Sequence, residues 1–133
     1  MGLLTFKGGI HPNDGKSLAK DKAIVEVLPE GDLVFPLSQH IGAPAAPIVK
    51  VGDQVLKGQK IAEAGGFVSA PVYSSVSGKV KAIAPYFTPT GGKVSSIIVE
   101  NDGAYTEAER LSTRPLEMLS KEEILNLIAE AGI

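Results

Sequence analysis

The sequence has 133 residues, the size of one domain with a short appendage. Charged residues make up 21% and hydrophobic residues 44% of the chain, which is typical of a globular protein and excludes a disordered or fibrous one. The net charge of −2 and the scattered lysines exclude a basic footprint for nucleic acid or anionic lipid. The chain has no cysteine, which excludes disulfides, thiolate nucleophiles, zinc fingers and cysteine-ligated iron–sulfur clusters within it.

Turn-forming residues dominate the remaining composition. Fifteen Gly and nine Pro, with few aromatic residues and no Trp, predict many short strands joined by tight turns. No apolar run approaches the roughly 20 residues that span a bilayer, and the N-terminus lacks the apolar region of a signal peptide. We therefore expect a mainly β, intracellular domain without direct membrane insertion.

The N-terminal third predicts an extended arm followed by two strands. Residues 1–22 carry turn formers in quick succession and no sustained periodicity, so they indicate an arm. Residues 24–28 predict a first strand and residues 33–37 a second, with a turn at 29–32. Pro36 predicts an edge position for the second strand, because proline cannot donate to a central ladder.

Residues 41–84 alternate short apolar segments with turns at close spacing. Val-Gly-Asp at 51–53 and Lys-Gly-Gln at 57–59 mark a first half. A second half follows Gly65-Gly66, with valines at 68, 72, 76 and 80 around a Ser-Gly turn at 77–78. This approximate repeat of strand, turn and strand predicts two halves that close into a flattened barrel.

The C-terminal part predicts one late strand and one helix. Residues 97–99 predict the strand, after a turn at 90–92. Ser120 and Glu123 form a capping-box pattern for a helix over about 121–131. Its predicted apolar face consists of Ile124, Leu125, Ile128 and Ala131. Because so short a helix is marginal alone, we expect it to pack on the barrel or on a domain outside this chain.

The central segment resembles the biotinyl/lipoyl, or barrel-sandwich-hybrid, architecture, in which Val-Gly-Asp, Lys-Gly-Gln and Ser-Gly turns recur in this order. The resemblance implies a carrier lysine at the tip between the two halves. Phe67 stands near that position here, and the nearest lysines are Lys60 and Lys79. A swinging-arm carrier is therefore disfavoured, while a lysine-less adaptor domain stays an alternative.

A more specific resemblance covers nearly the whole chain. The segments FKGGIHP at 6–12, PLSQHIGAP at 36–44, SAPV at 69–72 and residues 49–62 resemble the N-terminal domain of RnfC, a subunit of the Rnf electron-transport complex. The resemblance implies three parts: an N-terminal arm at 1–22, a barrel-sandwich hybrid at 23–105, and a linker with an amphipathic helix at 106–133. It also implies that a nucleotide-binding domain follows beyond Ile133.

The Rnf resemblance implies a membrane-bound complex that moves electrons between ferredoxin and NAD and couples the transfer to ion translocation. RnfC would be a peripheral part on the cytoplasmic side, carrying FMN, NAD(H) and two [4Fe-4S] clusters on motifs that this sequence lacks. We therefore assign no catalytic, cofactor-binding or metal residue to the chain and do not expect it to be catalytic alone. The expected role is a structural or docking domain whose partners are other domains of RnfC and other Rnf subunits. The alternative is an RnfC-like electron-transfer protein of another reductase system.

Several other residues allow a chemical and a structural interpretation. His11 and His40 could bind a metal, but without carboxylate or thiolate partners nearby, structural hydrogen bonding is favoured. Gly8-Gly9 and Gly91-Gly92 lack the spacing of a phosphate cradle and favour turns. The serines at 74, 75 and 77 lack the nucleophile-elbow pattern that a catalytic serine requires.

Three aromatic residues are the candidate docking residues: Phe67, Tyr86 and Phe87. Pro85 and Pro89 lie near the second and third of them in sequence. An exposed aromatic group of this kind is typical of a partner-binding surface. The alternative is that these rings pack at one end of the barrel.

Overall fold

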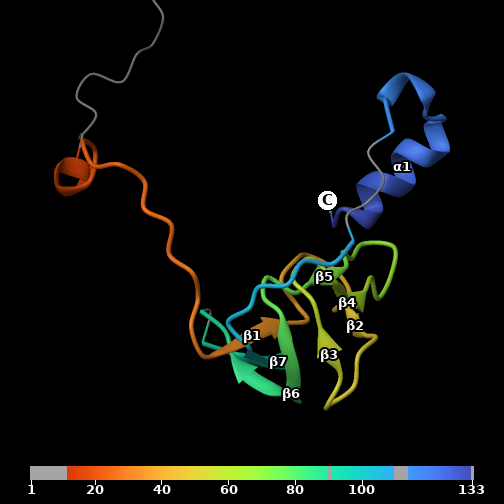
Figure 1. The fold of residues 1–133 in the computed structure, drawn as a ribbon, viewed down its shortest axis with the longest axis horizontal. Coiled ribbons are helices and arrows are strands. Elements are labelled where there is room, and N and C mark those ends of the chain that lie inside the picture. The colour runs from red at the N-terminus through yellow and green to blue at the C-terminus, as the bar shows by residue number, and fades with distance from the viewer. Residues whose placement is uncertain (1–11, 90, 110–113, 133) are drawn as a thin grey trace, which may run out of the picture.

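The computed structural model describes residues 12–89, 91–109 and 114–132. Within these residues, antiparallel strands form a four-stranded sheet in the order β1-β7-β6-β3 and a three-stranded sheet in the order β2-β4-β5 (Figure 1). The strands are β1 (Asp32–Pro36), β2 (Ala46–Pro47), β3 (Gln54–Val55), β4 (Lys60–Glu63), β5 (Val72–Tyr73), β6 (Gly78–Phe87) and β7 (Lys93–Asn101). The prediction of a mainly β barrel-like fold is confirmed.

The helical elements lie outside the barrel. They are the 3-10 helices η1 (Lys16–Leu18) and η2 (Leu116–Met118) and the α-helix α1 (Lys121–Glu130). The predicted capping box is present, since the Ser120 side chain accepts from the Glu123 N–H and the Glu123 carboxylate accepts from the Ser120 N–H.

The two halves of the predicted repeat interlock. Strand pairs cross between the halves, because β3 pairs with β6 and β4 pairs with β5. The turns take part as well: the Gly52 N–H donates to the Val80 carbonyl at 2.8 Å, and the Gly58 N–H donates to the Ser74 carbonyl at 2.7 Å. Neither half can therefore complete its backbone hydrogen bonds without the other.

Polar residues in these turns hold them closed. The Asp53 carboxylate accepts from the Lys50 N–H at 2.7 Å, and the Gln59 side-chain carbonyl accepts from the Leu56 N–H at 2.9 Å. These short-range bonds satisfy backbone donors that the strands leave unpaired. They explain why Val-Gly-Asp and Lys-Gly-Gln act as turn sequences.

The core lies between the two sheets and is made of aliphatic side chains with one aromatic ring. Each fully buried Val or Ile contributes roughly 1.5–3 kcal/mol relative to an exposed position. The buried hydrophobic residues are Phe35, Leu37, Ala45, Val49, Val55, Ile61, Ala62, Val72, Val76, Val80, Ile97 and Val99.

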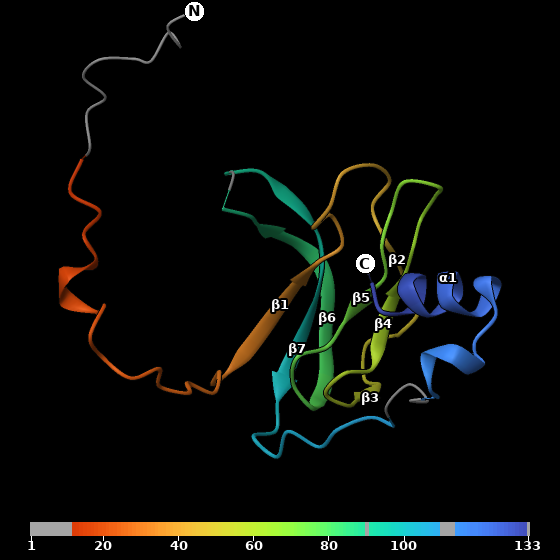
Figure 2. The ribbon, with the colours of Figure 1, turned by 90° about the horizontal axis from the view of Figure 1, so that it is seen from above.

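The N-terminal prediction was right for the second strand and wrong for the first. The second strand is β1, and it lies at the edge of its sheet as Pro36 indicated. Residues 24–28 are exposed and join no sheet; instead they continue the arm away from the barrel (Figure 2). The reason lies at Pro29, whose carbonyl accepts from the Asn101 side-chain amide and the Tyr105 hydroxyl. This attachment turns the chain away from β1 and prevents a hairpin.

The predicted apolar face of the C-terminal helix was only partly right. Ile124 is half-buried, but Leu125 and Ile128 are exposed, and Leu127 is half-buried in their place. The helix meets the barrel at its C-terminal end, where the Tyr73 hydroxyl donates to the Glu130 carbonyl. This contact, rather than the apolar stripe alone, sets which side of α1 faces the barrel.

Candidate functional site

Two loops at one end of the barrel are joined by hydrogen bonds, and we call residues 38–45 and 64–70 the loop pair. The Ala43 N–H donates to the Val68 carbonyl at 2.9 Å, and the Ser69 hydroxyl donates to the Ala43 carbonyl at 2.8 Å. The Ser69 oxygen also accepts from the Gly65 N–H at 2.9 Å. One serine thus ties together both sides of its own loop and the loop opposite.

Close backbone contact adds to these bonds. A Cβ atom on Gly42 would lie 2.0 Å from the Val68 carbonyl oxygen, and one on Gly65 would lie 2.0 Å from the Pro44 carbonyl oxygen. Gly42 also has φ +97°, a conformation that side-chain-bearing residues rarely adopt. The loop pair therefore requires glycine on each side of the contact.

His40 has the structural role that the sequence favoured. Its Nε2 accepts from the Ala70 N–H at 3.2 Å, and its Nδ1 lies 3.1 Å from the Ile41 carbonyl oxygen. Both ring nitrogens are satisfied if Nδ1 carries the proton and donates to that carbonyl. His11, the other half of the metal pair considered from the sequence, lies outside the described residues.

Apolar side chains project from this braced framework into solvent. Phe67 is fully exposed, and Ile41 and Val68 are also exposed, at 87% and 55%. Val68 lies against Gly42, the neighbour of Ile41, so the apolar residues of the two loops are adjacent. Exposed apolar groups on a rigid polar framework are typical of a binding surface.

Tyr86 and Phe87 lie elsewhere, at the end of β6 in the β6–β7 hairpin. Figures 1 and 2 both show the tip of this hairpin on the opposite side of the molecule from the loop between β4 and β5. Both rings are exposed, and the Lys93 ammonium lies 4.6 Å from the centre of the Phe87 ring. The structure therefore does not bring Phe67 together with Tyr86 and Phe87.

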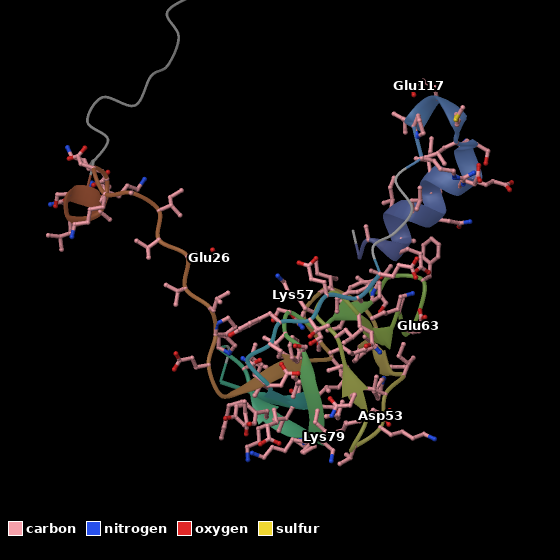
Figure 3. The ribbon with its side chains drawn as sticks, viewed as in Figure 1. Glu26, Asp53, Lys57, Glu63, Lys79 and Glu117 are labelled. Atoms are coloured by element: carbon pink, nitrogen blue, oxygen red, sulfur yellow. The ribbon has the colours of Figure 1, made fainter. Side chains whose placement is uncertain are left out.

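The lysines near the carrier position are engaged in the fold. Lys60 Nζ lies 2.7 Å from the Glu130 carboxylate and 3.2 Å from the Glu63 carboxylate. The hydrogen bond to Glu130 raises the pKa of Lys60 above its ordinary value. Lys79 lies on β6, and Figure 3 shows it on the opposite side of the barrel from Lys57. Phe67 thus occupies the loop tip without a lysine beside it in sequence.

A cavity of about 660 Å³ lies where α1 meets the barrel. Burial raises the pKa of Tyr73, one of its lining residues. Across the cavity mouth, Lys57 pairs with Glu107 at 3.3 Å and exchanges backbone hydrogen bonds with Thr106 and Ala108. The lining consists of Lys57, Gly58, Gln59, Lys60, Tyr73, Glu107, Ala108, Glu109, Glu130 and Ala131. Sequence reasoning missed this junction, because the contact between Tyr73 and Glu130 spans 57 residues and has no local signal.

The serines have structural partners. The Ser77 hydroxyl donates to the Asp102 carboxylate at 2.7 Å and accepts from the Thr106 N–H at 2.9 Å. That hydrogen bond from Ser77 lowers the pKa of Asp102 below its ordinary value. The Ser74 hydroxyl donates to the Val76 carbonyl at 2.7 Å. Both side chains therefore bridge turns of the barrel.

The glycine pairs and the metal question complete the survey. Gly91 and Gly92 form a turn closed on Thr88, whereas Gly8 and Gly9 lie outside the described residues. Within ranges 12–89, 91–109 and 114–132, no group of three or more His, Cys, Asp or Glu side chains could hold a metal ion. Over the same ranges, the search for a helix long and apolar enough to cross a bilayer finds none.

Comparison with known proteins identifies the family. The family model for the RnfC Barrel sandwich hybrid domain matches residues 4–104. The RnfC-type subunit of the proton-translocating ferredoxin:NAD(+) oxidoreductase complex of Clostridium ljungdahlii is 47% identical over 98% of this chain. The corresponding subunit of the Na(+)-translocating complex of Acetobacterium woodii is 41% identical over 97%. The chain spans 29% of the length of each of these relatives. It belongs to the RnfC family of ion-translocating oxidoreductase complexes, as the barrel-sandwich-hybrid domain of that family.

Proposed function

We propose that this chain is the docking domain of an RnfC protein, acting within an ion-translocating ferredoxin:NAD oxidoreductase on the cytoplasmic side of the membrane. The observation that carries the proposal is the loop pair, which holds Ile41, Phe67 and Val68 in solvent on a braced framework. Its partners are other domains of RnfC and other subunits of the complex. Tyr86 and Phe87 form a second, separate candidate contact.

The chemistry of electron transfer is assigned to residues outside this chain. A [4Fe-4S] cluster requires thiolate ligands, and the sequence contains no cysteine. The residues present therefore do not fit the clusters, and we propose no FMN or NAD(H) site among them. What the chain supplies is a rigid surface that positions the redox-active parts.

The test is assembly of a chimeric complex. In the chimera, this chain replaces the matching region of the Clostridium ljungdahlii relative, and co-purification of the other subunits is measured. We expect the chimera to co-purify with them and the Phe67→Ser/Val68→Ser variant to lower the co-purified yield about tenfold, as for loss of an interface hot spot. The Tyr86→Ser/Phe87→Ser variant tests the second contact.

The matched control is Val51→Ser, which removes another exposed valine on a turn of the same barrel. It should leave the yield unchanged, and the melting temperature of each isolated variant checks its fold. Unchanged assembly of both aromatic variants would contradict the docking role.

A further inference from the structure

Residues 24–28 form an apolar strand sequence that the barrel does not use. Ile24, Val25, Val27 and Leu28 are each at least 52% exposed, and the segment belongs to no sheet. Scattered apolar residues are normal on a surface, but a contiguous run of β-branched and aliphatic side chains is not. Such a run has high β propensity, and an extended segment of this kind can add as a strand to an open sheet edge.

The barrel fixes the point from which this segment leaves. The Pro29 carbonyl accepts from the Asn101 side-chain amide at 2.8 Å and from the Tyr105 hydroxyl. Tyr105 has φ +52°, a left-handed conformation that costs a non-glycine residue about 1–3 kcal/mol. A strained residue thus helps to hold the base of the arm, so the segment is presented in a defined direction.

A second copy of this chain is a poor partner for the segment. In an antiparallel self-pair centred on residue 26, Glu26 would face the Glu26 of the other copy, and like charges in that position are destabilising. A shifted register would set the carboxylate against an aliphatic side chain. So short a pair also buries far less than the roughly 1,200 Å² of a stable interface.

We propose that residues 24–28 add as a strand to an open sheet edge in the part of an RnfC protein that lies outside the region matched by this chain. The proposal rests on the proposed function above. Most of the length of the Clostridium ljungdahlii relative lies outside the match, so a large body is available. Figure 1 shows that the arm and α1 rise from the same side of the barrel, and Figure 3 shows Glu26 on the arm, away from the barrel.

Alternation along the strand specifies the chemistry of the partner edge. Val25 and Val27 share one face, which requires an apolar surface below the added strand. Ile24 and Leu28 flank Glu26 on the other face, so we expect Lys or Arg opposite the carboxylate. The partner is therefore an open edge strand that carries one cation between apolar neighbours.

Amide hydrogen exchange tests the proposal in the full-length chimera described above, with the isolated 133-residue chain as reference. We expect the segment's edge-facing amides to exchange at least about a hundredfold more slowly in the chimera than in the isolated chain. Val25→Asp/Val27→Asp should abolish the protection and Glu26→Lys should reduce it. The control Leu18→Asp changes an exposed residue of η1 outside the segment and should leave it intact.

Equal exchange of these amides in the chimera and the isolated chain would overturn the added strand. Protection in the isolated chain that grows with its concentration would also overturn it, in favour of self-pairing. The result is independent of the docking test: a chimera that co-purifies with its partners while the segment stays unprotected contradicts only the added strand. A protected segment in a chimera that fails to co-purify contradicts only the docking role.

Discussion

Gly42 and Gly65 determine how closely the two loops of the loop pair approach each other. Each faces a carbonyl oxygen of the opposite loop at a distance that leaves no room for a side chain. The hydrogen bonds of Ser69 and His40 hold the loops at that separation. The position of the exposed Phe67 ring therefore depends on residues that bear no functional group themselves.

Gly42→Ala tests this dependence, with Gly52→Ala as its matched control. Both glycines have φ +97°, but a Cβ on Gly52 meets no atom within 4 Å. We expect Gly52→Ala to cost about 1–2 kcal/mol of unfolding free energy from backbone strain alone. Gly42→Ala should cost about 1–3 kcal/mol more, because a carbonyl must also move. Urea denaturation measures the difference, and equal losses would show that the loops are not in close contact.

Sequence reasoning found the turns at this scale and missed the contacts between them. Val-Gly-Asp and Lys-Gly-Gln were recognisable because Asp53 and Gln59 bond to backbone three residues away. The contact from Ser69 to Ala43 spans 26 residues, and that from Tyr105 to Pro29 spans 76. Nothing in the sequence near either residue encodes such a partner.

At the level of elements, α1 shows the same division. Its N-terminus was predictable because Ser120 and Glu123 cap it locally, within one turn. Its buried side was not, because the Tyr73 and Lys60 side chains hold Glu130 from strands far away in sequence. The first strand was mispredicted for a similar reason, since a distant attachment at Pro29 overrides the strand propensity of residues 24–28.

The cap of α1 should lose its contribution in acid. Hydrogen bonding from the Ser120 N–H, followed by Arg114, lowers the pKa of Glu123 from 4.5 to about 2. A folded-state pKa below the unfolded value means that the contribution is fully present above pH 4.5 and is lost as the pH falls to about 2. Carboxyl chemical shifts should therefore titrate with a midpoint near 2 for this residue.

Arg114→Met should move that midpoint upward, because it removes the guanidinium 2.6 Å from the carboxylate. Glu123→Gln should remove the acid-dependent loss of helicity seen by circular dichroism, whereas Glu122→Gln, in the same first turn, should retain it. A midpoint near the ordinary glutamate value would mean that the cap does not form in solution.

On the scale of the whole molecule, the interlocked halves form one unit to which the arm and α1 are attached. Because β3 and β4 of one half pair with β6 and β5 of the other, we expect the barrel to unfold as a whole. The helix is joined to it by the contacts of Tyr73 and Lys60, which a local opening can break. Stability should therefore differ between the barrel and its attachments.

Native-state hydrogen exchange of Ile97→Val separates these units. Ile97 is fully buried in β7, and the lost methylene should lower the unfolding free energy by about 0.5–1.5 kcal/mol. If the barrel opens only as a whole, the slowest amides of β6 and β7 should lose that same amount of protection. The amides of α1 should exchange at unchanged rates, because they open without the barrel. An equal loss of protection in α1 would instead show that the helix unfolds with the barrel, and its contacts with Tyr73 and Lys60 would then belong to the cooperative core.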